Sequence, residues 1–297
     1  MDINFNYISK NYMNTINAEQ NIIKKEIKGY NLSKKRVKHY CEIDKYTLYN
    51  ERNDEKKIGN IYINYGNNHY QILSSNNKIK KKGNNIGFED PRVFSYKNNN
   101  YILVNAIGIN SIRNMYLINI EKKSVVQLKV INNNHMNTID QKNWSPYIYN
   151  NKLYFIYSFM PLVILETINI EDGYVKLVKG NEEDQSNLNK NNDDKIFGST
   201  PLIPYQDGNY ICFTHTRNPY LAVPLIYNPF TMKIIKIGNK LLFDYPKESQ
   251  TKKNNWKNVQ FAYDIKKDKD IYKLYIEFRN KCSGILYIKE NDIYNFF

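Results

Sequence analysis

Short runs that alternate apolar and polar residues, separated by turn-forming residues, dominate the chain from about residue 86 onward. In "EDPRVFSYKNNNYILVNA", which starts at Glu89, two such runs flank the turn "YKNNNY". The stretches "NWSPYIYNNKLYFIYSF" and "GSTPLIPYQDGNYICFTHTR" repeat the arrangement around "YNNKLY" and "YQDGNY". Alternation with a period of two predicts strands, and a tight turn between two such runs predicts a β-hairpin.

These hairpins recur at a fixed interval. Pro91, Pro146 and Pro201 open three copies and lie 55 residues apart (146 minus 91, and 201 minus 146). A weaker copy, "NVQFAYDIKKDKDIYKLYIEFR", places Phe261 60 residues after Pro201 and lacks the proline. Residues between the copies supply further strands, such as "MYLINI" and "SVVQLKV". Each unit therefore holds roughly four strands, which is the size of a propeller blade.

At about 55 residues per unit, the 297 residues hold about five units. We therefore predict an all-β fold, a single five-bladed β-propeller over residues 1–297 with about four antiparallel strands per blade. Residues 1–36 fit the pattern poorly, helical spacing is confined to a weak stretch at 15–27, and residues 181–195 form a low-complexity loop. A β-sandwich is the alternative fold, but it does not explain the repeat.

Composition and charge modify this picture in two ways. The formal net charge is +14, but the basic runs at residues 24–39 and 78–85 fall in loop-like or N-terminal stretches, so we predict no specific nucleic-acid binding. Attraction to phosphate-bearing substrates stays compatible with the charge. The three cysteines are far apart and form no C-x-x-C pair, which indicates neither a zinc site nor a disulfide framework.

The sequence shows no metal-ligand spacing and no glycine-rich phosphate loop, so we predict no metal and no cofactor. It also shows no apolar run near the ~18 residues needed to cross a bilayer, and its start lacks the apolar core of a signal peptide. We expect a cytoplasmic protein without membrane contact. The oligomeric state is left open.

The first strand of every propeller blade faces the central channel, so equivalent positions of different blades converge there. One polar cluster before a hairpin is typical of a turn, whereas clusters at a fixed interval are typical of a site. We predict that these clusters line one pocket: Glu89, Asp90 and Arg92; Lys142, Asn143, Trp144 and Ser145; Ser199 and Thr200; and Gln260.

Such a pocket offers one strong carboxylate and several cations. Successive strand residues face opposite sides, so Glu89 and Asp90 are predicted to point apart, while Asp90 and Arg92 could share a face. Hydrolytic glycosidases usually need two carboxylates. An enzyme whose reacting group is already an anion, such as phosphate, needs one acid and a basic cradle. The cradle residues predicted from their places in the repeat are Arg113, Lys142 and His215.

Several of these predicted site residues could instead have a purely structural role. The Glu89–Arg92 stretch could be a turn held by a local ion pair, and Trp144 could pack between blades instead of contacting sugar. His215 could be a satisfied inner-strand histidine. The hydroxyls that could simply satisfy backbone donors are those of Ser145, Ser199 and Thr200.

Four segments resemble a known family in their order and spacing: "GFEDPR", "QKNWSPYIYNNKLYFIYS", "FGSTPLIPYQDGNYICFTH" and "NKCSGIL". Over roughly residues 86–290 they look like the successive signatures of the β-mannoside phosphorylases and related β-mannosyltransferases, the five-bladed propellers of glycoside hydrolase family 130. The resemblance implies an inverting transfer of mannose. It implies that Asp90 is the general acid, which protonates the glycosidic oxygen through a sugar hydroxyl.

The resemblance further implies that a phosphate or sugar phosphate is held by Arg113, Asn114, Lys142 and His215. Trp144 and Ser145 would contact sugar. The remaining predicted substrate-binding residues are Glu89, Arg92, Asn143, Thr200 and Gln260.

Two departures from the family bear on substrate identity. Members usually carry an acidic residue just before the cysteine of the last signature, where this chain has Lys281. The usual N-terminal sugar-contacting signature is at best a remnant, "FNYISKNY". We therefore expect an inverting glycoside phosphorylase, or a mannosyltransferase using a sugar phosphate or nucleotide sugar, with inorganic phosphate or those donors as partners. The alternative is a catalytically degenerate propeller that binds glycans or a protein.

Overall fold

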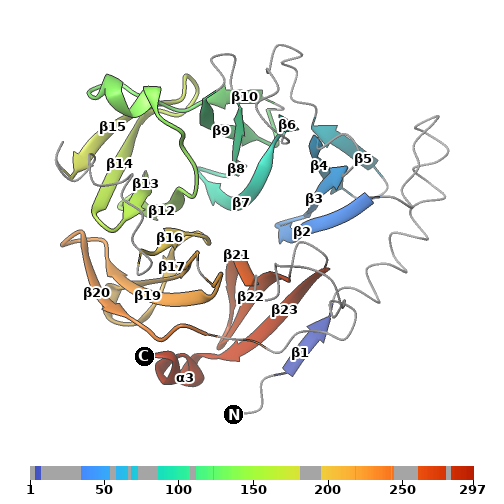
Figure 1. Cartoon of the computed structure of the whole chain (residues 1–297), viewed down its shortest axis with the longest axis vertical. Coiled ribbons are helices and arrows are strands. Elements are labelled where there is room, and N and C mark those ends of the chain that lie inside the picture. Colours follow the sequence, from blue (N-terminus) through green and yellow to red (C-terminus); the bar gives the residue numbers. More distant parts are fainter. Residues whose placement is uncertain are drawn as a thin grey trace.

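The computed structural model describes residues 4–7, 35–53, 58–65, 68–72, 86–107, 112–122, 124–180, 195–217, 219–241, 243, 260–278 and 282–297. Nearly all of the regular structure in these residues is β-strand. Sheets follow one another around a common centre, and the colours run once around the ring from blue to red (Figure 1).

Each sheet is built from strands that are consecutive, or nearly so, in the sequence. The first contains β2 (Lys35–Ile43), β3 (Tyr46–Asn53), β4 (Ile58–Tyr65) and β5 (Asn68–Ile72), with β6 (Ile86–Gly87) alongside β4. The second contains β7 (Glu89–Tyr96), β8 (Asn99–Ile107), β9 (Arg113–Asn119) and β10 (Ser124–Gln127). The third contains β12 (Ser145–Tyr149), β13 (Lys152–Phe159), β14 (Leu162–Asn169) and β15 (Tyr174–Lys179), with β11 (Lys129–Val130) parallel to β15.

The fourth sheet contains β16 (Phe197–Gly198), β17 (Ile203–Pro204), β18 (Tyr210–His215), β19 (Ala222–Asn228) and β20 (Lys233–Ile237). The last contains β21 (Gln260–Asp268), β22 (Ile271–Phe278), β23 (Cys282–Lys289) and β1 (Asn4–Tyr7). Because β1 pairs antiparallel with β23, from Asn4 opposite Tyr287 to Tyr7 opposite Gly284, this sheet joins sequence from both ends of the chain. The short helices are η2 (Asn134–Thr138), η4 (Gln206–Gly208), α3 (Glu290–Ile293) and η6 (Tyr294–Phe296).

Two of the predicted hairpins close with two-residue turns. Lys97 and Asn98 have φ values of 48° and 60°, and Asn150 and Asn151 have values of 48° and 57°. Positive φ at both central residues is the signature of the type I′ turn, whose twist matches that of the flanking strands. Asparagine tolerates this region better than most residues, so its abundance at these positions directly supports the hairpins.

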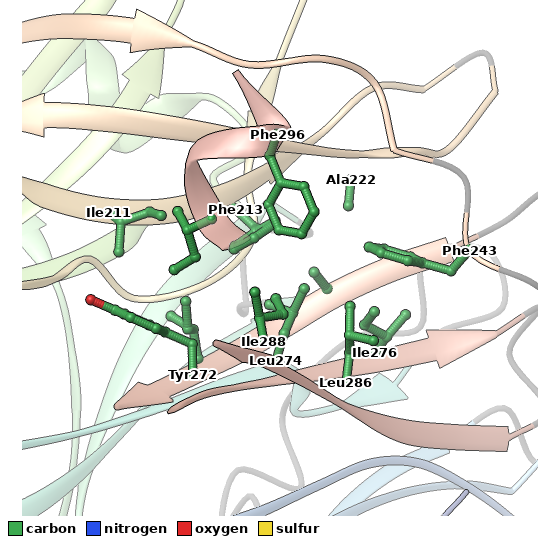
Figure 2. Close-up of a cluster of buried hydrophobic side chains, with 13 residues drawn as sticks. Ile211, Phe213, Ala222, Phe243, Tyr272, Leu274, Ile276, Leu286, Ile288 and Phe296 are labelled. Carbon is green, nitrogen blue, oxygen red and sulfur yellow. The ribbon is translucent and has the colours of Figure 1, made fainter. Parts of the chain in front are cut away.

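The hydrophobic core is divided among the spaces between neighbouring sheets. One cluster lies between the sheet of β18 and β19 and the sheet of β21–β23 (Figure 2), where the rings of Phe213 and Phe296 meet edge to face, with centroids 6.3 Å apart. A second cluster includes Leu103 of β8 and Phe155 of β13, so it joins the β7–β10 sheet to the β12–β15 sheet. Packing of each sheet against the next holds the ring together.

The all-β propeller prediction is confirmed. The 55-residue repeat corresponds to successive innermost strands, since Pro91 lies in β7, Pro146 in β12 and Pro201 just before β17. The predicted blade count depends on the β2–β5 sheet, for which the structure describes the backbone but only some of the side chains. The weak helical stretch at 15–27 and residues 181–194 of the predicted loop lie outside the described residues.

Within the described part of the chain, helices are too short and too polar to cross a membrane. The predicted cytoplasmic location stays a prediction.

Replacing Phe213 with alanine should lower the free energy of unfolding by about 3–5 kcal/mol, because it empties a fully buried ring site between two sheets. Urea unfolding followed by circular dichroism measures this. Phe230→Ala is the matched control, since that ring is 80% exposed and its loss should change the free energy by less than about 0.5 kcal/mol. Equal effects of the two substitutions would contradict the packing described for this cluster.

Candidate functional site

Asp90 lies in a β-bulge at the start of β7. Glu89 pairs with Asn105 and Arg92 pairs with Leu103, so β7 has one more residue than β8 over the same stretch. Asp90 has φ of 51°, in the left-handed region. A bulge re-aims the side chains around it, so the simple alternation predicted for Glu89 to Arg92 does not hold. The Asn105 amide fixes the bulge by donating to Asp90 Oδ2 (3.3 Å) and to the Glu89 carbonyl (3.2 Å).

Arg92 is buried, and its guanidinium bonds to backbone carbonyls of its own strand and of a distant sheet; we call this group of bonds the Arg92 clamp. Its Nε donates to the Ser199 carbonyl (2.6 Å), Nη2 to the Gly198 carbonyl (3.1 Å) and Nη1 to the Asp90 carbonyl (2.8 Å). The sheets of β7 and β16 are separated by the β12–β15 sheet, so this side chain connects two non-neighbouring sheets (Figure 1). Burial lowers the pKa of Arg92 to about 10, against the opposing effect of Asp90, so it stays charged at neutral pH.

Arg113 joins the bulge from β9. Its Nη1 donates to Glu89 Oε2 (2.7 Å) and to Asn105 Oδ1 (2.5 Å), and its backbone N–H donates to Asp140 Oδ1 (2.8 Å). Asn105 therefore bonds to the bulge through its amide nitrogen and to Arg113 through its oxygen. Glu89 is consequently an ion-pair partner of Arg113, whereas Asp90 accepts from a neutral amide.

His215, at the end of β18, is 2% exposed and neutral. Its Nδ1 lies 2.7 Å from Ser199 Oγ. The ring stacks on Tyr220 (centroids 5.5 Å apart) and meets the edge of Phe261 (5.0 Å). Burial, followed by the charges of Arg92 and Arg217, lowers the pKa of His215 to about 3. The predicted contact with an anion would therefore come from a neutral N–H group.

Lys142 precedes β12 and is exposed to solvent, yet its pKa is lowered. The largest cause of the lowered pKa is desolvation of the ammonium group by the protein around it, and the charges of Arg217 and Arg113 come next. Asp90 and Asp140 act in the opposite direction. The charges of Arg217, Arg113 and Asp90 therefore all act on Lys142. That these residues line one pocket stays a prediction.

Arg217 was not predicted as a site residue. Its guanidinium lies 4.1 Å from the ring centroid of Phe197, a cation–π geometry. Its charge lowers the pKa of His215, Lys142 and Lys195, so it belongs to the same basic group. The available signal was its place in "FTHTR", two residues after His215, the last residue of β18.

Asn143 and Ser145 pack against the backbone that Arg92 holds. A Cβ atom on Gly198 would lie 2.1 Å from the Asn143 carbonyl oxygen and 2.7 Å from Ser145 Oγ, so only glycine fits there. Asn143 is buried, with φ of 62°. Ser145 Oγ is buried and has no hydrogen-bond partner among the described residues. These two residues lie against the backbone of Gly198, and their contact with substrate stays a prediction.

The remaining predicted residues are engaged in structural contacts. Trp144 is fully buried against Phe155 and Tyr157 (ring centroids 5.7 and 5.3 Å away), which supports packing between sheets and not sugar stacking. Thr200 Oγ1 accepts from the backbone N–H of Phe213 (3.0 Å).

Gln260 and Asn114 bond to the main chain as well. The Gln260 amide accepts from the backbone N–H of Phe243 (2.8 Å) and donates to its carbonyl oxygen. Asn114 Nδ2 donates to the Ile112 carbonyl (3.1 Å). Lys281 and the side chains of "FNYISKNY" lie outside the described residues. Among the residues that are described, His, Cys, Asp and Glu form no group that could hold a metal ion.

Comparison of the sequence with known proteins finds no matching family model and no matching curated protein. The structure, in contrast, is similar to that of β-1,2-mannobiose phosphorylase from Listeria innocua, with a TM-score of 0.62, 12% identity and 99% of each chain covered. The fold is that of the mannoside phosphorylases. The resemblance predicted from the four sequence segments is therefore confirmed as a likeness of fold.

Two further structures extend this likeness. A GDP-Man-dependent mannosyltransferase from Leishmania mexicana matches with a TM-score of 0.55 and 11% identity, over 92% of this chain and 94% of that one. A glycosyl hydrolase from Bacteroides ovatus matches with a TM-score of 0.63 and 9% identity, over 86% and 84%. The same fold is thus shared by proteins described as phosphorylases, transferases and hydrolases.

His215 should not titrate between pH 5 and 9, because its folded-state pKa is about 3. In the unfolded chain its pKa is about 6.5. The folded state therefore gains stability from this group above about pH 6.5 and loses it progressively as the pH falls toward 3. A pH series of imidazole NMR spectra measures the titration, with His215→Gln identifying the resonance. A midpoint near 6.5 would contradict the burial of a neutral ring.

Proposed function

We propose that this chain is a carbohydrate-active enzyme that transfers mannose with inversion, either as a β-mannoside phosphorylase or as a mannosyltransferase using a sugar phosphate or nucleotide sugar. The observation that carries the proposal is the pairing of one carboxylate with a group of cations. Asp90 is held by a neutral amide beside Lys142, Arg113 and Arg217. This is the arrangement expected when the reacting partner is an anion.

Glu89 supports this proposal against simple hydrolysis. An inverting hydrolase needs a second carboxylate that can act as a base toward water. The nearby Glu89 accepts a 2.7 Å hydrogen bond from Arg113 within an ion pair, so its carboxylate is already engaged by a protein partner. Phosphate carries its own negative charge and requires no base.

In the proposed phosphorolysis, a phosphate oxygen forms a bond to the anomeric carbon as the bond to the glycosidic oxygen breaks. Asp90 supplies the proton that the departing oxygen takes up, through a sugar hydroxyl as the family resemblance implies. Lys142, Arg113 and Arg217 hold the phosphate. In the synthetic direction the same residues act in reverse, with the phosphate as the leaving group and Asp90 accepting the proton.

We also infer that the β2–β5 sheet completes a five-bladed ring. Ile43, Leu48 and Ile61 from this sheet belong to one buried cluster with Val104 of β8. This cluster joins the sheet to its neighbour in the same way as the clusters between the other sheets. With this fifth sheet in place, sheets would surround the proposed site on every side.

Asp90→Asn should lower the rate of mannosyl transfer by about 10²–10⁴-fold, because the amide keeps the shape of the side chain but has no acidic proton to give. The assay supplies mannose 1-phosphate or GDP-mannose with a set of sugar acceptors, and follows released phosphate or nucleotide. Asp172→Asn is the matched control, since Asp172 lies in an exposed turn where it accepts from Asn169. Wild-type turnover by Asp90→Asn would refute the acid assignment, and sugar binding without turnover by the wild type would favour the degenerate binding propeller.

Lys142→Ala should weaken binding of phosphate, mannose 1-phosphate or GDP-mannose by roughly tenfold or more, since a hydrogen bond to a charged group contributes about 1.5–3 kcal/mol. Thermal-shift titration with each ligand measures the loss and shows which anion class the site prefers. Lys152→Ala removes a lysine that pairs with Glu166 on the β13–β14 hairpin and should change nothing. Equal affinities of the two variants would argue against an anion site at Lys142.

A further inference from the structure

A chain of hydrogen bonds runs from Arg92 to His215 through one serine. The Arg92 Nε–H group donates to the carbonyl of Ser199 (2.6 Å), and the hydroxyl of the same residue lies 2.7 Å from His215 Nδ1. All three side chains are buried, with exposed fractions of 1%, 0% and 2%. Water therefore does not compete for these contacts, and each polar atom depends on the partners that the protein supplies.

The position of the Ser199 proton follows from counting partners. A serine hydroxyl has one proton to donate. Among the described residues, His215 Nδ1 is the one partner that Ser199 Oγ contacts. If Nδ1 carried the proton, the Ser199 hydroxyl would be left buried with no acceptor, at a cost of about 1–3 kcal/mol. The favourable arrangement has Ser199 donating to Nδ1, which places the imidazole proton on Nε2.

Arg92 fixes where this hydroxyl stands. By binding the carbonyls of Gly198 and Ser199, its guanidinium sets the path of the backbone that carries the hydroxyl. Gly198 also packs closely against Asn143, since an added Cβ would lie 2.1 Å from the Asn143 carbonyl oxygen. The backbone that carries the serine hydroxyl is therefore bonded to Arg92 on one side and packed against Asn143 on the other.

We propose that Ser199 and Arg92 are positioning residues that hold His215 as a neutral imidazole protonated on Nε2, so that it donates a hydrogen bond to an oxygen of the bound phosphoryl group. This inference rests on the proposed function for its ligand, although the state of the ring itself does not. Neither Ser199 nor Arg92 touches the phosphoryl group in this arrangement, since both act through His215.

A neutral donor suits a site that already contains several cations. Lys142, Arg113 and Arg217 supply positive charge, and a further cation at His215 would be repelled by Arg92, Arg217 and Lys142. Burial is the largest cause that lowers the pKa of His215 to about 3, and these three charges add to it. A neutral N–H group adds a directed hydrogen bond without that repulsion, and its donor state does not change over the physiological pH range.

The direct test is the tautomer of His215 in the wild-type protein. In ¹⁵N-histidine-labelled protein at pH 7, long-range ¹H–¹⁵N correlation spectra distinguish a protonated ring nitrogen from an unprotonated one. The expected spectrum has Nε2 protonated and Nδ1 unprotonated, with the signal assigned by its loss in His215→Gln. Protonation on Nδ1, or on both nitrogens, overturns the proposal. This measurement needs no substrate.

Ser199→Ala tests the positioning role. It should release the ring into a mixture of tautomers and weaken phosphate binding by about tenfold, and Ser199→Thr, which restores a hydroxyl, should recover part of both. Thr214→Val is the matched control. Thr214 precedes His215 in the chain, and its buried hydroxyl donates to the Val223 carbonyl and not to the His215 ring. Ser199→Ala with an unchanged tautomer and unchanged affinity would overturn the proposal.

Phosphate binding separates this inference from the proposed function. If the wild type shows the Nε2-protonated ring but no phosphate response that depends on Lys142, the anion site fails and so does the donor role of His215, while the hold of Ser199 on the ring stands. If phosphate binds through Lys142 but His215 carries its proton on Nδ1, the anion site stands and the positioning proposal fails. Arg92→Lys, which keeps the charge but loses the planar fork, should disturb the tautomer in the same direction as Ser199→Ala.

Discussion

The buried guanidinium of Arg92 is the constraint on which the centre of this molecule depends. A charge removed from water is costly unless its donors find partners, and here three carbonyl oxygens accept from Nε, Nη1 and Nη2. Two belong to Gly198 and Ser199, in a sheet that is not adjacent to that of Arg92. The third belongs to Asp90, the candidate acid. The clamp therefore fixes the relative positions of the two segments from which the site is built.

Its partners also determine the electrostatics of the site. Arg92 donates to carbonyl dipoles in all three of its described hydrogen bonds, so its positive charge is less fully compensated than it would be in an ion pair with a carboxylate. That charge contributes to keeping His215 neutral. Lys142 and Arg217 act on His215 in the same direction, so the positive charges of three side chains combine around this ring.

The sequence predicted the fold better than the site because the two depend on different kinds of information. Strands and hairpins follow from a period of two and from turn residues such as Asn150 and Asn151, and the propeller follows from the interval between Pro91, Pro146 and Pro201. Each of these signals is repeated, so a local irregularity does not hide it. The prediction that Asp90, Lys142 and Arg113 face one pocket came from the same repeat, and the charges of Asp90 and Arg113 do act on Lys142.

The details that the sequence did not predict arise from single-residue irregularities and from contacts between distant segments. A bulge adds one residue to β7, and neither the letters "EDPR" nor their alternation shows which residue is extra. The same uncertainty hid the direction of Trp144, which follows Asn143 in its left-handed conformation and turns into the core. The partners of Arg92 lie more than 100 residues away, at Gly198 and Ser199. No local pattern encodes such a pair.

These differences explain how the chain keeps the propeller fold at about 10% identity to its structural neighbours. The clusters between sheets require apolar volume, and many combinations of side chains supply it. The channel-facing segments have a narrower choice, because a buried guanidinium needs carbonyls in a fixed geometry and Gly198 leaves no room for a side chain. The short segments around Arg92 and Gly198 are therefore more narrowly constrained in sequence than the rest of each sheet, where alternation is enough. Because phosphorylases, transferases and hydrolases share this fold, the protonation and hydrogen bonds of Asp90, Arg92, Ser199 and His215 distinguish between these activities better than the fold does.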